Sequence, residues 1–246
     1  MIKFLPPKRL LLIATLGSIA GIVVTTTNPV HSKVLNLGFL ASLLGTWLGS
    51  LIIGWKIRPL RFIFVTLPIL ALGLLLLPGE EIDSSELRKD YVKRMTILEG
   101  TRYHWGGEGA NGIDCSGLPR RALRNSLLAY GFRHLNGQAF RIYLEHWWHD
   151  ASAKALSEGY RNYTQSVGTA GTIRQLDHSG LVAGDLAVTT NGLHVIVYLG
   201  GDEWIQADPG IGTVAILNGR TDDNPWFTVP VEMHRWRISE QHLPLK

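Results

Sequence analysis

The chain has 246 residues, a formal net charge of +4 and 46% hydrophobic residues. Its single cysteine excludes an intramolecular disulfide, so an apolar core must hold the fold. Residues 1–79 carry seven basic side chains and no acidic one, whereas residues 80–246 carry 17 basic and 20 acidic side chains. The basic residues of the first part flank apolar runs and form no patch on the second part, which argues against nucleic acid as a partner.

Three apolar runs open the sequence, at residues 10–24, 34–55 and 60–77. Each is close to the roughly 17–25 residues that a helix needs to cross a bilayer. None contains an acidic residue, so residues 1–79 are predicted to form a membrane anchor of three transmembrane helices. The alternative for each run is a buried core helix. Two patterns of small residues allow close packing of the first two helices: Gly17-x-x-x-Gly21 and Gly45-x-x-x-Gly49.

Charges at the ends of these runs predict the orientation of the anchor. Basic residues precede the first run and cluster between the second and third, whereas an acidic segment follows the third. By the positive-inside rule, the anchor is a multi-pass segment of the cytoplasmic (inner) membrane, with the following domain periplasmic or extracellular. A cleaved signal peptide in place of the first helix leaves that domain on the same side. The basic residues concerned are Lys3, Lys8, Arg9, Lys56, Arg58 and Arg61.

Residues 80–246 have the pattern of a soluble domain. We expect a helix that is capped near Ser84 and ends at Gly100, then a glycine-rich loop, a helix over residues 115–129 and a helical, aromatic-rich segment over residues 133–163. Helices followed by an antiparallel sheet indicate an α+β fold. From residue 181 the apolar period changes to two, which predicts strands at residues 186–188, 193–199, 203–207, 214–217 and 231–238.

The only cysteine lies where the glycine-rich loop meets the second of these helices. The positive end of a helix and its free N–H groups favour a thiolate over a thiol, so Cys115 is a candidate nucleophile. A small buried side chain is the alternative interpretation of an isolated cysteine. The polar neighbours Asp114 and Ser116 favour the nucleophile.

A cysteine nucleophile needs a base, and His194 at the start of an apolar strand is the best placed of nine histidines. A third polar residue should hold the imidazole in the right tautomer. If Gly200, Gly201 and Asp202 form a three-residue hairpin loop, Asp208 lies opposite His194, and Gln206 is a diagonal neighbour on the same face. Both side chains are able to accept the imidazole N–H. Gln206 lies inside the predicted strand, whereas Asp208 precedes a proline.

At these residues the sequence closely resembles the NlpC-type cell-wall peptidases, a branch of the papain-like fold. The resemblance covers most of residues 84–210, and the matching pieces follow the family's order. They are Tyr103 with Trp105-Gly106-Gly107, Asp114-Cys115-Ser116-Gly117-Leu118, Gly184-Asp185-Leu186, His194 with Tyr198-Leu199-Gly200, and Ile205-Gln206-Ala207.

The resemblance implies hydrolysis of a peptide bond in peptidoglycan stems, usually between D-glutamate and the diamino acid, through an acyl-enzyme. By position, Cys115 would be the nucleophile, His194 the base and acid, and Gln206 the orienting residue. Tyr103 would contact the reacting centre, and Asp114 and Ser116 would bind the stem peptide. The Cys115 N–H would be one of the oxyanion donors. No cofactor is implied.

Two features depart from the family pattern. The family most often has a second histidine where Gln206 stands, and residues 133–171 form an insert, expected to be a helical lid or cleft wall. A metal site at His146 and His149 of this insert lacks further ligand spacing, so a polar helix face is preferred. The alternatives for the whole domain, residues 80–246, are an amidase or acyltransferase on another amide or lipid, and an inactive membrane-tethered binding module. No pattern indicates an oligomeric state.

Overall fold

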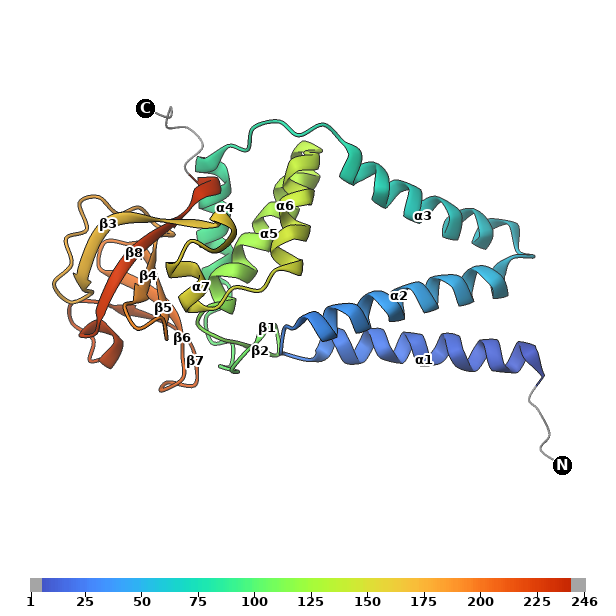
Figure 1. Cartoon of the computed structure of the whole chain (residues 1–246), viewed down its shortest axis with the longest axis horizontal. Helices are drawn as coiled ribbons and strands as arrows, with labels where there is room; N and C mark the ends of the chain where they lie inside the picture. Colours follow the sequence, from blue (N-terminus) through green and yellow to red (C-terminus); the bar gives the residue numbers. More distant parts are fainter. Residues whose placement is uncertain (1–5, 240–246) are drawn as a thin grey trace.

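The computed structural model describes residues 6–239. Its first part consists of three long helices, α1 (Pro7–Thr27), α2 (Lys33–Gly54) and α3 (Arg58–Leu76), at the right of Figure 1. By length and composition, each is able to cross a membrane. At most 11% of the apolar window of each helix is buried inside the protein, so the alternative of buried core helices is wrong.

Small residues bring α1 and α2 together. Gly45 and Gly49 of α2 face Ser18 and Thr15 of α1 so closely that an added Cβ would collide with those side chains. The glycine pattern therefore predicts the close packing of these helices correctly. Gly17 is different, since no atom of the other helix lies within 4 Å of its Cβ position.

The second part is an α+β domain, as predicted. Asp83, and not Ser84, caps its first helix, because the Asp83 carboxylate accepts hydrogen bonds from the N–H groups of Ser85 and Glu86 at 2.8 and 3.0 Å. The helical elements of the domain are α4 (Ser84–Thr96), α5 (Gly117–His134), α6 (Gly137–Trp148), α7 (Ala153–Ser157), η1 (Tyr160–Asn162), η2 (Pro225–Phe227) and η3 (Arg237–Ser239).

A six-stranded antiparallel sheet begins after η1 in the chain, with the strand order β3-β8-β4-β5-β6-β7. A short hairpin, β1 (Glu108–Gly109) and β2 (Gly112–Ile113), lies apart from it, between α4 and α5 in the sequence. The strands of the sheet are β3 (Thr164–Thr172), β4 (Leu186–Thr189), β5 (Val195–Gly200), β6 (Glu203–Asp208), β7 (Thr213–Asn218) and β8 (Pro230–Trp236).

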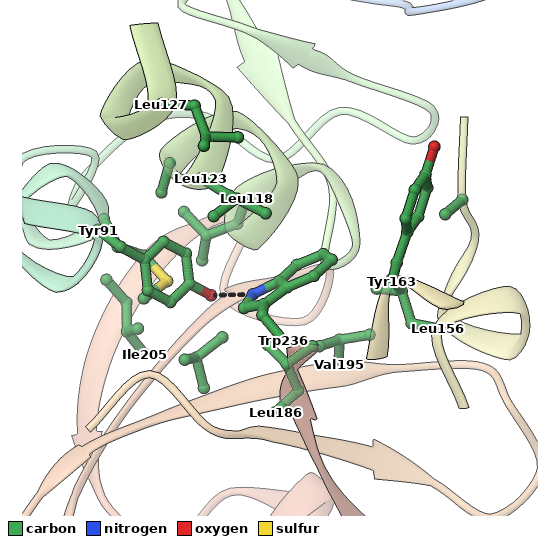
Figure 2. Packing of buried hydrophobic residues seen from close by; sticks show 14 of the residues in the cluster. Tyr91, Leu118, Leu123, Leu127, Leu156, Tyr163, Leu186, Val195, Ile205 and Trp236 are labelled. Atoms are coloured by element: carbon green, nitrogen blue, oxygen red, sulfur yellow. Dashed lines mark hydrogen bonds between the residues drawn. The ribbon is translucent and has the colours of Figure 1, made fainter. Parts of the chain in front are cut away.

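Apolar side chains form a core on each face of the sheet. The larger core lies between the sheet and helices α4 and α5, and Figure 2 shows Tyr91 and Trp236 at its centre. The indole N–H of Trp236 donates to the Tyr91 hydroxyl at 3.1 Å, so both buried polar atoms are paired. The second core lies around Trp204 and Phe227. This packing holds the start of α5 beside strands β5 and β6.

The structure corrects the predicted content of the insert. Residues 137–148 and 153–157 are helical, but residues 164–172 form the edge strand β3. The sequence of β3 is Thr-Gln-Ser-Val-Gly-Thr-Ala-Gly-Thr, and Val167 is its only large apolar residue. Most of its side chains alternate between partly buried and exposed positions, as in a strand at the edge of a sheet. Pairing with β8 stabilises this strand, and no local pattern indicates that pairing.

The hairpin of β5 and β6 has the predicted register but a different turn. Val197 pairs with Ile205 and Tyr198 with Trp204, as the predicted register requires. Gly200, and not Leu199, pairs with Glu203, and a bulge at this point absorbs the difference. The register that matters for His194 and Gln206 was therefore correct.

Candidate active site

Cys115 lies in the connection between the β1–β2 hairpin and α5. The helix begins at Gly117, two residues later than the sequence predicted, with Ser116 at its N-cap position. The glycine loop, residues 104–114, runs back against this helix start: a Cβ on Gly117 would collide with the Gly107 carbonyl. Glycine at this position therefore allows the loop and the helix to meet beside Cys115.

Asp114 fastens the glycine loop to α5. Its Oδ2 accepts the N–H of Gly106 at 2.9 Å, and its Oδ1 accepts the N–H of Gly117 at 2.6 Å. The hydroxyl of Ser116, which is buried, donates to the same Oδ1 at 3.1 Å. Two of the three predicted substrate-binding residues, Asp114 and Ser116, thus lie next to Cys115, and both already have partners within the protein.

The Cys115 side chain lies against the backbone that carries His194. Its Sγ is 3.9 Å from the carbonyl oxygen of Leu193, to which the thiol donates. The N–H of Val195 points to the same sulfur and favours its thiolate form. The thiol therefore contacts the chain on both sides of His194.

Burial raises the pKa of the Cys115 thiol from 9.0 to about 11, with a second contribution from the negative charge of Asp114. The N–H groups of Val195, Ser116 and Cys115 lower this pKa, but by less. The expectation of a thiolate at the helix start is therefore wrong for the resting protein. At neutral pH the thiol keeps its proton.

The imidazole of His194 is held by Gln206 and not by Asp208. His194 Nε2 is 2.7 Å from Gln206 Oε1, and both side chains are buried. Gln206 Nε2 donates to Asp208 Oδ2 at 3.2 Å. Asp208 in turn accepts a bond from Asn224 Nδ2 at 2.7 Å. These residues form one chain of hydrogen bonds that ends at the imidazole.

This chain fixes the tautomer of His194. An ionised carboxylate only accepts hydrogen bonds, so the side-chain N–H of Gln206 must point to Asp208. The oxygen of Gln206 then points to His194, which must donate from Nε2. The other ring nitrogen, Nδ1, carries the lone pair. Burial lowers the pKa of His194, against the hydrogen bond that the ring donates to Gln206 and the charge of Asp208, so the ring is neutral at rest.

Two further contacts of this site have no signal in the sequence. The ring of Trp226 stacks on His194 at 4.1 Å between centroids and 15° between planes. The Thr189 hydroxyl accepts the N–H of His194 at 2.9 Å. Trp226 and Asn224 lie in the chain after β7, where the sequence analysis assigned no role.

Tyr103 lies on the same side of the domain as the thiol. Its N–H donates to the Gly212 carbonyl at 2.8 Å, which joins the residue before the glycine loop to the turn after β6. Burial and the charges of Cys115 and Asp114 raise the pKa of its hydroxyl to about 12. The hydroxyl is therefore a hydrogen-bond donor at neutral pH.

The loop between α1 and α2 pairs with the glycine loop. Val30 forms an antiparallel bridge with Gly107. His31 N–H donates to the Gly106 carbonyl at 2.9 Å, and Glu108 N–H donates to the Pro29 carbonyl at 2.9 Å. Residues 29–31, in the loop between the first two helices, thus pair with the glycine loop on the segment that leads to Cys115.

Glu108 ties this pairing to α5. Its carboxylate, which is buried, is 2.9 Å from Arg124 Nη1, 3.3 Å from Arg120 Nη2 and 3.4 Å from His31 Nδ1. Arg120 also pairs with Asp150. Residues before Cys115, residues after it and the α1–α2 loop therefore meet at one buried carboxylate.

A cavity of about 200 Å³ lies beside this pairing, between the C-terminal end of α1, the N-terminal end of α2 and the end of α6. None of Cys115, His194 and Gln206 lines it, so it is separate from the candidate active site. Its lining includes Asn28, Leu35, Phe39, Glu108 and Trp147.

Within residues 6–239, no group of three or more histidine, cysteine, aspartate or glutamate side chains is arranged to hold a metal ion. His146 is buried and stacks on Tyr163 at 4.0 Å, and burial lowers its pKa to about 3. His149 is partly exposed at the end of α6. The expected polar helix face is therefore wrong for His146, which packs in the core, whereas His149 is partly exposed.

The sequence matches the model of the NlpC/P60 family over residues 100–223. Comparison with curated proteins gave no match. Two solved structures are similar to this chain, each at 21% sequence identity over 61% of it. One is the peptidoglycan hydrolase RipB from Mycobacterium tuberculosis, with a TM-score of 0.35; the match spans 65% of RipB. The other is the P60 domain of antigen MAP1204 from M. avium subspecies paratuberculosis, with a TM-score of 0.34 and 95% of that domain matched.

The raised thiol pKa predicts slow alkylation of Cys115 by iodoacetamide. A pKa of about 11 instead of 9.0 leaves about 100-fold less thiolate at pH 8. We expect the rate for the folded chain to be at least that much lower than in urea, and to keep rising with pH up to about 11. Alkylation that reaches its maximum rate near pH 7 would contradict the neutral thiol.

The pairing of the α1–α2 loop with the glycine loop predicts a difference between two substitutions of His31. His31→Pro removes the N–H that bonds to Gly106, whereas His31→Ala keeps it. We expect the proline variant of the full chain to change the rate and pH profile of Cys115 alkylation, and to lower turnover about 10-fold or more, because small displacements of a reacting group are costly.

The alanine variant is the matched control and should be closer to the wild type on both measurements. Equal effects of the two substitutions would assign the influence of His31 to its side chain and not to the backbone pairing. A thermal unfolding curve separates a displaced thiol from a loss of folding.

Proposed function

Because the chain belongs to the NlpC/P60 family, we propose that it is a membrane-anchored cysteine peptidase that hydrolyses peptidoglycan stem peptides. Its target is the bond between D-glutamate and the diamino acid. Cys115 is the nucleophile, His194 the base and then the acid, and Gln206 the orienting residue. One observation carries this proposal: the Cys115 thiol lies against the backbone of His194, whose ring is oriented by Gln206.

The first half of the reaction forms a thioester on Cys115. His194 Nδ1 takes the thiol proton as Sγ attacks the carbonyl carbon of the stem peptide. Because thiol and imidazole are both neutral at rest, this proton moves during the attack. The N–H of Cys115 donates to the developing oxyanion. The C–N bond then breaks, and His194 returns the proton to the leaving amine.

The second half releases the product. Water attacks the thioester carbon while His194 Nδ1 takes a proton from it, and the proton passes to Sγ as the C–S bond breaks. During each half the ring carries a positive charge for a time. The oxygen of Gln206 stabilises that charge directly, and the carboxylate of Asp208 stabilises it from further away.

Three further residues act on the substrate in this proposal. The protonated hydroxyl of Tyr103 donates to the peptide at the reacting centre. The charge of Asp114 attracts the free amine of the stem, while its oxygen atoms hold the glycine loop. Ser116 supports this carboxylate through its hydroxyl and binds the backbone of the stem.

Residues 1–79 are the membrane anchor of this enzyme, and residues 80–246 are its hydrolase domain. The three apolar helices supply the length for three spans. Basic residues at the start of α1 and around the turn between α2 and α3 favour the cytoplasmic side for those ends, which puts the domain outside the cytoplasmic membrane, facing the wall.

The direct test is digestion of purified muropeptides by the full chain in detergent, followed by mass spectrometry. We expect products cut after D-glutamate, and no product with Cys115→Ala, because no other cysteine can replace the nucleophile. Circular dichroism confirms that the variant is folded. A folded wild-type chain that leaves every muropeptide intact would refute the proposal, and a cut at another bond would correct the substrate.

A second experiment compares the two polar residues behind His194. Gln206→Ala removes the direct partner of the imidazole, so we expect kcat to fall about 100-fold or more. Asp208→Asn removes only the charge that orients Gln206, so its effect should be smaller. Asp202→Asn, an exposed acid of the same hairpin, is the control and should retain full activity. A larger loss in Asp208→Asn than in Gln206→Ala would transfer the orienting role to Asp208.

A further inference from the structure

Helix α6, in the insert of the domain, contacts the outer end of α3 with its first turns. The N–H of Gly137 donates to the Pro78 carbonyl at 2.9 Å. Arg141 Nη1 donates to the carbonyls of Leu75 at 2.7 Å and Leu77 at 3.2 Å. A Cβ on Gly137 would collide with the Leu77 carbonyl. The start of α6 is therefore fixed against the last turn of an apolar helix.

The other end of α6 contacts the outer end of α2. The side-chain N–H of Asn36, which is buried, donates to the Trp147 carbonyl at 3.1 Å. The rings of Phe39 and Trp147 meet edge to face, 6.1 Å apart. Asn36 and Phe39 belong to the first two turns of α2. Figure 1 shows α6 crossing between the outer ends of α3 and α2, transverse to both.

These two contacts lie at the same height along the spans. Counted from the inner ends, Asn36 is 18 residues above Gly54 in α2, and Leu75 is 17 residues above Arg58 in α3. At 1.5 Å per residue, the heights are about 27 Å and about 26 Å. The hydrocarbon layer of a bilayer is about 30 Å thick. Both contacts therefore lie near its outer boundary, so α6 runs along the plane of the membrane.

The outward face of α6 has the composition of a helix at a membrane surface. Arg141, Leu144 and Trp148 are spaced by three and four residues and share one face. Leu144 is 39% exposed, and Trp148 is partly exposed. The opposite face, with Ala139 and His146, is buried in the domain. Tryptophan and arginine around an apolar centre are typical of the boundary between lipid tails and headgroups.

We propose that α6 lies in the outer headgroup–acyl boundary of the bilayer, with Leu144 directed into the lipid. The partner of this face is the membrane itself, and α6 adds a lateral support to the three spans. The proposal rests on the membrane anchoring proposed above, but not on the peptidase activity.

The test places one spin label at a time on the full chain in lipid nanodiscs. Cys115→Ser removes the only thiol, and Leu144→Cys, Leu43→Cys or Thr221→Cys then supplies a single attachment site. Leu43 is exposed in the middle of α2, and Thr221 is exposed in the loop after β7. Power saturation measures the collision of each label with oxygen, which concentrates in lipid, and with a water-soluble nickel complex.

We expect the ratio of oxygen collisions to nickel collisions to be several-fold higher for the label at position 144 than for the label at position 221. The same ratio should be lower at position 144 than at position 43. A label at position 144 that meets nickel as often as the label at position 221 would refute the lipid contact. A label that meets neither reagent would show a protein partner on α6, which also overturns the proposal. If the label at position 43 meets nickel freely, the anchoring itself fails, and muropeptide cleavage is tested separately.

Discussion

The buried carboxylate of Glu108 is the interaction on which the arrangement around Cys115 depends. A carboxylate without water is stable only with charged or hydrogen-bonded partners, and loss of one partner costs about 3–5 kcal/mol. Glu108 belongs to the hairpin before Cys115, and its partners Arg120 and Arg124 belong to the helix after it. The backbone on both sides of the thiol is therefore held at one point, which His31 of the α1–α2 loop also contacts.

Asp114 completes this frame at the other end of the glycine loop. Its two oxygen atoms hold Gly106 and Gly117, so the loop cannot move without exposing unpaired N–H groups. Helices α1 and α2 are part of the same frame, because the segment between them pairs with the loop. This segment therefore contacts the backbone that leads to the thiol.

Much of this arrangement could be predicted from the sequence, because it depends on local patterns. The apolar runs predicted three helices that are long and apolar enough to cross a membrane, and the period-two alternation predicted strands β4 to β8. The register of β5 and β6 was correct and placed Gln206 within reach of His194, since residue parity decides which side chains share a face. The roles proposed for Cys115 and His194 come from local sequence patterns and from the family resemblance, and that of Gln206 comes from the resemblance. All three stay predictions.

The errors have physical causes that sequence periodicity does not contain. Strand β3 exists because β8 pairs with it, and the stacking of Trp226 on His194 joins distant segments of the chain. The prediction of an ionised thiol was wrong because desolvation and the charge of Asp114 raise the pKa of Cys115 by more than the nearby N–H groups lower it. Desolvation and the effect of the Asp114 charge both depend on how tightly the folded chain encloses the Cys115 side chain, so no sequence motif reveals them.

The protonated state of Cys115 has a consequence for the oxidation of this side chain. Peroxides and disulfides react with thiolates, so a thiol with a pKa near 11 is oxidised slowly. This protection matters in a chain with one cysteine, because no second thiol is present to rescue a sulfenic acid by forming an internal disulfide. Burial thus protects the sulfur of the resting protein from oxidation.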